Sequence, residues 1–147
     1  MKIAIGADAA GFAMKAALIA HLTQQGYEVK DFGTYNEESC DYPLMAKGPC
    51  QAVQNGDDQF GILVCGTGIG MSMAANKHKG IRAAVCSEHF SARYTRLHND
   101  ANVICLGARV IGDALAMELV ELFLTTEFEG GRHGRRVDQM SEIEKEN

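Results

Sequence analysis

Short apolar runs of strand length alternate along the chain with longer segments whose apolar residues recur at helical spacing, and this alternation constrains the fold most strongly. It predicts strands at residues 2–7, 27–32, 60–64, 81–86 and 102–106, and helices at residues 11–25, 42–55, 69–77, 88–97, 113–124 and after Gly134. Continuously apolar strands joined by helices are typical of a parallel sheet that is covered on both faces. The sequence therefore predicts a single doubly wound α/β domain over residues 1–147, with a five-stranded parallel sheet.

One predicted helix carries a breaking signal. In residues 42–55, Pro43 is acceptable in the first turn, but Gly48 and Pro49 lie in the interior. A proline at that place removes a helix hydrogen bond and clashes with the preceding turn. We therefore expect a kink or a break near Pro49.

Composition excludes several classes of protein. No apolar run approaches the roughly 20 residues that a membrane helix needs, and the N-terminal residues lack the pattern of a signal peptide. The net charge of −5 argues against nonspecific binding of nucleic acid. The 5 cysteines form no CxxC pair, no metal-ligand spacing and no disulfide framework. We therefore expect reduced thiols in a cytoplasm and no bound metal.

Ligands of doubly wound sheets bind beyond the carboxyl ends of the strands, near the point where the strand order reverses. The most informative segment there follows the third predicted strand and consists of Cys65, Gly66, Thr67, Gly68, Ile69 and Gly70. Its alternate glycines expose backbone N–H groups at a helix start, which suits an anion, although a tight turn explains the glycines equally well. The segment matches neither GxxxxGK[ST] nor GxGxxG, so a nucleotide-binding module is a poor match.

Cys65 and His98 are the candidates for proton transfer. Amides that hold an anion also stabilise a thiolate, so Cys65 is a competent base or nucleophile. The alternative is a small buried apolar residue, which is the better account of Cys86 and Cys105. His98 lies near the end of a predicted helix, either as a cap that complements the helix dipole or as a proton donor.

Residues 130–136 form the one strongly basic cluster in this acidic chain, with Arg132 and Arg136 among its members. The planar guanidinium suits phosphate, whereas the alternative is a solvated tail beside acidic neighbours. Together with Asp8, Thr67 and the thiol, these groups suit proton transfer next to a carbonyl, with backbone amides stabilising an enediolate. Aldose–ketose isomerisation of a sugar phosphate fits this set and needs no redox cofactor.

Four motifs resemble those of one enzyme family. They read CGTGIGMSMAANK at residues 65–77, GIRAAVCSE at 80–88, HNDANV at 98–103 and EGGRH at 129–133. These segments are similar to the type B ribose-5-phosphate isomerases, a family that includes galactose-6-phosphate isomerase subunits and allose-6-phosphate isomerases. The resemblance spans the chain. It implies a Rossmann-like fold, a sugar phosphate substrate, no cofactor, and a homodimer, sometimes paired into a tetramer, with active sites formed between subunits.

The resemblance also implies a role for each matching position. Cys65 is the base that moves a proton between C1 and C2, and Thr67 is grouped with the catalytic residues. His98 opens the furanose ring as a proton donor with help from Asp8. The positions that contact substrate are Asp8, Ala9, Tyr42, Gly66, Thr67, Gly68, Ile69, Gly70, Asn99, Arg109, Arg132 and Arg136.

One position departs from the family. The motif G-x-D-H-x-G reads GADAAG at residues 6–11, so Ala9 replaces a histidine and can neither bind phosphate nor move protons. A lost polar contact to phosphate costs about 1.5–3 kcal/mol. The leading prediction is an isomerase of ribose 5-phosphate and ribulose 5-phosphate. The alternatives are the same chemistry on allose 6-phosphate, galactose 6-phosphate or a rare sugar phosphate, or a catalytically silent subunit that binds sugar phosphate.

Overall fold

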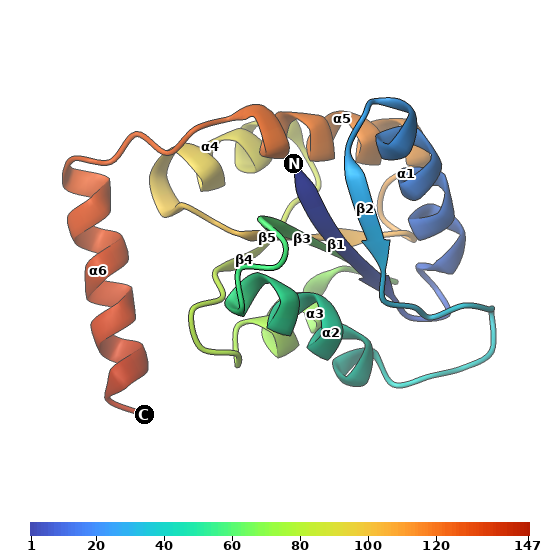
Figure 1. Cartoon of the computed structure of the whole chain (residues 1–147), viewed down its shortest axis with the longest axis horizontal. Coiled ribbons are helices and arrows are strands. Elements are labelled where there is room, and N and C mark those ends of the chain that lie inside the picture. Colours follow the sequence, from blue (N-terminus) through green and yellow to red (C-terminus); the bar gives the residue numbers. More distant parts are fainter.

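Five parallel strands form one sheet in the order β2-β1-β3-β5-β4 in this computed structural model, which describes all of residues 1–147 (Figure 1). The strands are β1 (Lys2–Ala7), β2 (Glu28–Asp31), β3 (Phe60–Cys65), β4 (Ala83–Val85) and β5 (Val103–Gly107). The helices are α1 (Phe12–Gln24), α2 (Tyr42–Gln54), α3 (Ile69–Ala75), α4 (His89–Asn99), α5 (Asp113–Thr125) and α6 (Arg132–Lys145). The predicted α/β fold with a five-stranded parallel sheet is confirmed.

Helices cover both faces of the sheet, with α2 and α3 on one face and α1, α4 and α5 on the other (Figure 1). All 6 residues of the central strand β3 are buried. Ile62 and Val64 point into the larger apolar cluster, and Leu63 and Cys65 point into the smaller one. Alternate residues of a strand face opposite sides of a sheet, so a strand buried on both sides must be apolar throughout.

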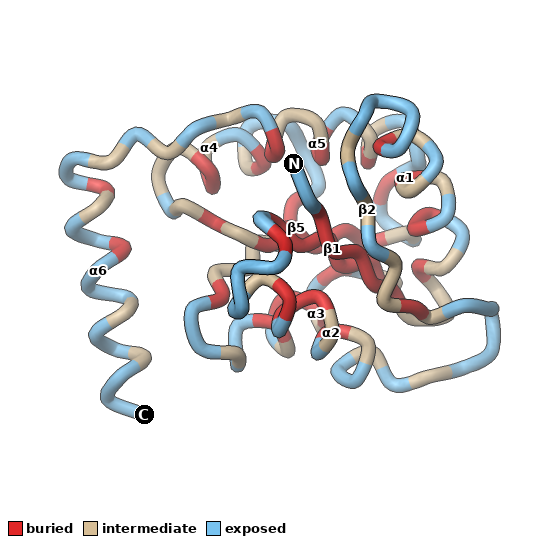
Figure 2. Tube along the Cα trace, in the orientation of Figure 1, coloured by how far each residue is buried: buried red, intermediate tan, exposed pale blue.

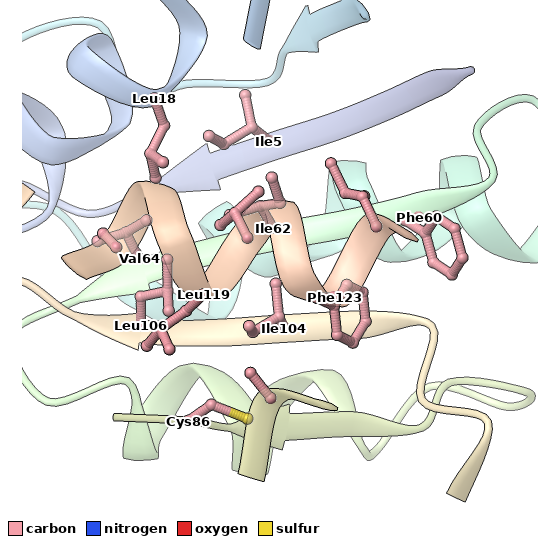
Figure 3. Packing of buried hydrophobic residues seen from close by; sticks show 14 of the residues in the cluster. Ile5, Leu18, Phe60, Ile62, Val64, Cys86, Ile104, Leu106, Leu119 and Phe123 are labelled. Atoms are coloured by element: carbon pink, nitrogen blue, oxygen red, sulfur yellow. The ribbon is translucent and has the colours of Figure 1, made fainter. Parts of the chain in front are cut away.

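The larger cluster lies between the sheet and the α1–α5 layer (Figure 3). Phe60 of β3 and Phe123 of α5 pack edge to face, with ring centroids 5.4 Å apart. The buried guanidinium of Arg96 lies 4.8 Å from the Phe60 ring, and its Nη1 donates to the backbone carbonyl of Ala101 at 2.7 Å. This packing ties the end of α4 to the start of β3.

Of the expected kink or break near Pro49, the break is wrong, because α2 continues through this residue. Pro49 is buried against β1, and a Cβ on Gly6 would come within 3.0 Å of its ring. Gly48 lies against the Phe32 ring, where an added Cβ would come within 2.5 Å of the aromatic carbons. Glycine at these two contacts allows a close packing that offsets the missing hydrogen bond.

Most element boundaries differ from the prediction by one or two residues, and two elements have a physical reason, β4 and the last helix. Strand β4 is only 3 residues long because it lies at the edge of the sheet, with partly exposed side chains. The last helix begins at Arg132 rather than after Gly134, since Gly130 and Gly131 turn the chain with φ of 73° and 58°. Gly134 is then accommodated inside the helix, where its added Cβ would meet nothing within 4 Å.

Helix α6 stands apart from the sheet and packs against α4 (Figure 1). Most of its residues are exposed, and His133 and Val137 are the buried ones (Figure 2). No helix of the chain combines the length and the apolar character needed to cross a membrane.

Candidate active site

The strand order reverses between β1 and β3, because the chain adds β2 on one side of β1 and then crosses to place β3 on the other. Ala7 and Val64 are paired at the ends of these strands, and the Asp8 amide donates to the Val64 carbonyl at 3.1 Å. Asp8 and Cys65 therefore leave the sheet side by side. This is the place where ligands of doubly wound sheets bind.

Cys65 ends β3 with its sulfur in a mixed environment. The residue is only 4 % exposed, and on one side it joins the smaller apolar cluster beside Met71 and Cys105. On the other side Sγ accepts a hydrogen bond from the Gly68 amide at 3.1 Å. An amide that donates to sulfur stabilises the thiolate, so this thiol differs from a purely packed one.

Cys86, just after β4, and Cys105, within β5, accept no such hydrogen bond. Both fit the packing role predicted for them. Burial raises the pKa of Cys86 to about 11 and raises the pKa of Cys105 well above its usual range. Both thiols therefore stay protonated at neutral pH.

The loop after β3 presents backbone amides toward the site. Gly68 has φ of 79°, and the amides of Gly66, Thr67 and Gly70 donate to no acceptor within the chain. The loop can pass close to the end of β5 because Gly107 there has no side chain. A Cβ at this position would come within 2.6 Å of the Thr67 carbonyl. Unsatisfied amides grouped beside a thiol provide hydrogen bonds for a developing oxyanion.

Tyr42 and Arg109 complete this carboxyl-edge group. A Cβ on Gly70 would lie 2.5 Å from the Tyr42 ring, so the ring covers the start of α3. The Arg109 amide donates to the Gly66 carbonyl at 3.0 Å, and its guanidinium folds back over Gly66. Ala9 follows Asp8 in the β1–α1 turn and adds no polar group.

The remaining predicted residues lie at the opposite edge of the sheet. Helix α4 links two parallel strands, β4 and β5, so it starts beyond their carboxyl ends and finishes beyond their amino ends. His98 and Asn99 are its last residues. The two edges are separated by the 6 residues of β3. Five steps of roughly 3.3 Å from the first residue to the last span about 16 Å. One chain therefore does not bring His98 to Cys65.

His98 sits in a stack of rings. The His133 ring lies parallel to it, with centroids 3.9 Å apart and an angle of 8° between planes, and Tyr94 meets it edge-on at 5.0 Å. Glu129 approaches both histidines, with Oε1 at 3.9 Å from Nε2 of His98 and Oε2 at 3.7 Å from Nε2 of His133. Sequence reasoning missed Glu129 and His133. Their spacing of four residues beside the basic cluster was the available signal.

These three side chains are also the only group whose ligand atoms could hold a metal ion, all within 4.8 Å of one another. The near-parallel rings place the in-plane lone pairs of the two histidines in parallel planes, so they do not converge on one ion. The arrangement suits the holding of a proton better.

Arg132 and Arg136 lie one turn apart on α6, beside His133. Both are exposed, and neither forms an ion pair with any carboxylate of the chain. The exposure of both side chains is also what the alternative, a solvated tail beside acidic neighbours, predicts. Two unpaired guanidiniums one turn apart suit a phosphate group.

The chain is similar in sequence and in fold to several known isomerases. The chain is 49% identical over 144 residues to ribose-5-phosphate isomerase B of Escherichia coli, with 98% of this chain and 97% of that protein covered. It is 44% identical to a D-erythrulose-4-phosphate isomerase of Pectobacterium atrosepticum, covering 98% and 95% of the two chains. The solved structure of Clostridium thermocellum ribose-5-phosphate isomerase B matches with a TM-score of 0.98 and 50% identity, covering 99% of each chain.

The model of one protein family matches nearly all of the chain, from residue 3 to residue 140. The matched range includes both edges of the sheet, from Asp8 at one edge to Arg136 at the other. Since both the sequence and the fold match, the chain belongs to the Ribose/Galactose Isomerase family.

Proposed function

We propose that the protein is an aldose–ketose isomerase that interconverts ribose 5-phosphate and ribulose 5-phosphate. The observation that carries the proposal is the hydrogen bond from the Gly68 amide to Cys65 Sγ, beside Asp8 at the reversal of strand order. A base held among free amides is what enediolate chemistry requires. The names of the Escherichia coli and Clostridium thermocellum relatives support the choice of substrate.

In the proposed reaction the Cys65 thiolate removes the proton from C2 of the open-chain aldose. The electron pair moves into a C1–C2 double bond, and the amides of Gly66, Thr67 and Gly70 stabilise the charge on oxygen. The thiol then returns the proton to C1, while a hydroxyl proton passes from O2 to O1. Atoms and charge balance without an external oxidant, so no redox cofactor is needed.

A second copy of the chain supplies the other half of the site in this proposal. His98 donates the proton that opens the furanose ring, with Asp8 assisting, and Asn99 binds sugar hydroxyls. Arg132 and Arg136 bind the phosphate, because both guanidiniums are exposed and unpaired. The separation of about 16 Å between the two edges supports this arrangement, since a two-fold dimer joins unlike edges of two chains twice.

One observation favours a second candidate substrate. Ala9 leaves the carboxyl edge without the histidine that the family motif provides, and one relative is a D-erythrulose-4-phosphate isomerase. The same chemistry on a sugar phosphate of another length is therefore the alternative function. Four-, five- and six-carbon sugar phosphates distinguish the two through their kcat/KM values.

The test is a coupled assay for ketose formation from ribose 5-phosphate by the purified chain and by Cys65→Ala. Removal of the base is expected to lower kcat by about 10²–10⁴-fold. Cys86→Ala, which removes a packed thiol, is the matched control and should retain activity. Labelling of Cys65 by a thiol reagent should slow in the presence of ribose 5-phosphate. Saturable sugar binding without turnover by the unaltered chain would instead identify a silent subunit.

A further inference from the structure

The His98 ring, near the end of α4, packs against two other aromatic rings. The ring stacks on that of His133, with centroids 3.9 Å apart. It is nearly perpendicular to the Tyr94 ring, with centroids 5.0 Å apart. Tyr94 is in turn stacked on Phe90 at 4.1 Å, so aromatic side chains continue along the same face of α4. The loop that carries Glu129 is tied to this helix, because the Glu129 amide donates to the Leu97 carbonyl at 3.1 Å.

The two stacked imidazoles are not equivalent. The His133 side chain is 9 % exposed, whereas that of His98 is 36 % exposed. Burial lowers the pKa of His133, and the charges of His98, Arg132 and Arg136 act in the same direction, against the opposing effect of Glu129. Burial and these neighbouring charges therefore favour the neutral form of His133.

Glu129 is the carboxylate that faces both rings. Its two oxygens lie 3.9 Å and 3.7 Å from the Nε2 atoms of His98 and His133, and no Lys or Arg forms an ion pair with it. A carboxylate at this distance stabilises an imidazolium. Glu129 lies against the Nε2 side of both rings.

We propose that Glu129 and His133 are positioning residues for sugar ring opening: His133 stacks on the His98 ring, Glu129 lies against its Nε2 side, and together they fix the orientation of His98. This inference rests on the proposed function, because it assigns a task to the proposed ring-opening acid. Neither residue needs to touch the reacting carbons. Their effect is confined to the step that delivers a proton to the ring oxygen.

The test separates ring opening from enediolate formation. Ribulose 5-phosphate cannot close to a furanose, because its O5 carries the phosphate. The exchange of its C1 proton with solvent deuterium, followed by NMR, therefore needs Cys65 but no ring-opening acid. His133→Ala should lower ribose 5-phosphate turnover about tenfold or more while leaving the exchange rate near that of the unaltered chain. His133→Phe, which keeps an uncharged aromatic ring at this position, should recover most of the lost turnover.

Glu129→Gln keeps the shape of the side chain and removes its charge. Ribose 5-phosphate turnover should fall about threefold or more, while the exchange rate stays near that of the unaltered chain. Equal losses of turnover and exchange in His133→Ala or in Glu129→Gln, or no recovery in His133→Phe, would each overturn the inference. Absence of exchange in the unaltered chain, or its persistence in Cys65→Ala, would instead refute the proposed function.

Discussion

The separation of the two groups of site residues leads to a quantitative prediction about mixed dimers. Cys65→Ala removes the proposed base at one edge of the sheet, and the double variant Arg132→Ala/Arg136→Ala removes the proposed phosphate ligands at the other. Loss of two charge-assisted contacts to phosphate, at about 1.5–3 kcal/mol each, should lower kcat/KM by about 10²–10⁴-fold. Both arginines are exposed and unpaired, so the double variant should fold normally.

A heterodimer of these two inactive chains should regain activity. If each site combines the carboxyl edge of one chain with the amino edge of the other, one of the two sites is intact and the other carries both defects. The heterodimer should therefore show about half of the wild-type activity per dimer. The assay is ketose formation from ribose 5-phosphate by heterodimers purified through a different affinity tag on each chain.

A matched heterodimer provides the control. It pairs the wild-type chain with a chain that carries all three substitutions, so both composite sites lose one half and activity should fall to background. If each site were formed within one chain, the results would be reversed: about half activity for this control and background activity for the mixed inactive chains. That reversal would refute the reasoning.

Three further predictions concern substrate affinity and stability. Ala9→His should raise kcat/KM for the physiological sugar phosphate about tenfold or more. If kcat/KM were the same for the variant and the unaltered chain on every pentose and hexose phosphate, a phosphate contact at this position would be contradicted. Phe123→Ala should lower the free energy of unfolding by about 3–5 kcal/mol in urea melts, whereas Ile143→Ala, at an exposed site, should change it little. Burial raises the pKa of Cys50 and Cys86 from 9.0 to about 11, so the unfolded chain ionises first and stability should fall as pH rises from about 9 to 11, less steeply in Cys50→Ala/Cys86→Ala.

The strands could be predicted from sequence because burial on both faces demands continuous apolar runs. Prediction was weakest where a neighbour decides the outcome. The length of β4 depends on its edge position, which only the sheet order reveals. Helix α2 runs through Pro49 because the chain opposite is Gly6, a contact between segments distant in sequence.

The candidate site divides in the same way. The Cys65–Gly70 loop and Asp8 could be located by the rule that ligands bind at carboxyl ends of strands, since both follow strands directly. His98 and Arg132 obey no such rule, because neither follows a strand: His98 lies near the end of α4, and Arg132 begins α6. The parallel stacking of His98 and His133 joins two helices, so no local pattern could predict it.

The central position of β3 has a consequence for slow motions of the molecule. Its amide protons, shielded by β1 and β5, should exchange with deuterated water only on global unfolding, whereas those of α6 should exchange through local fraying. The Cys65 sulfur thus lies in the segment that opens most slowly. The proposed phosphate ligands, Arg132 and Arg136, lie in one of the segments that open fastest. Gentle warming should therefore weaken anion capture well before the sheet melts.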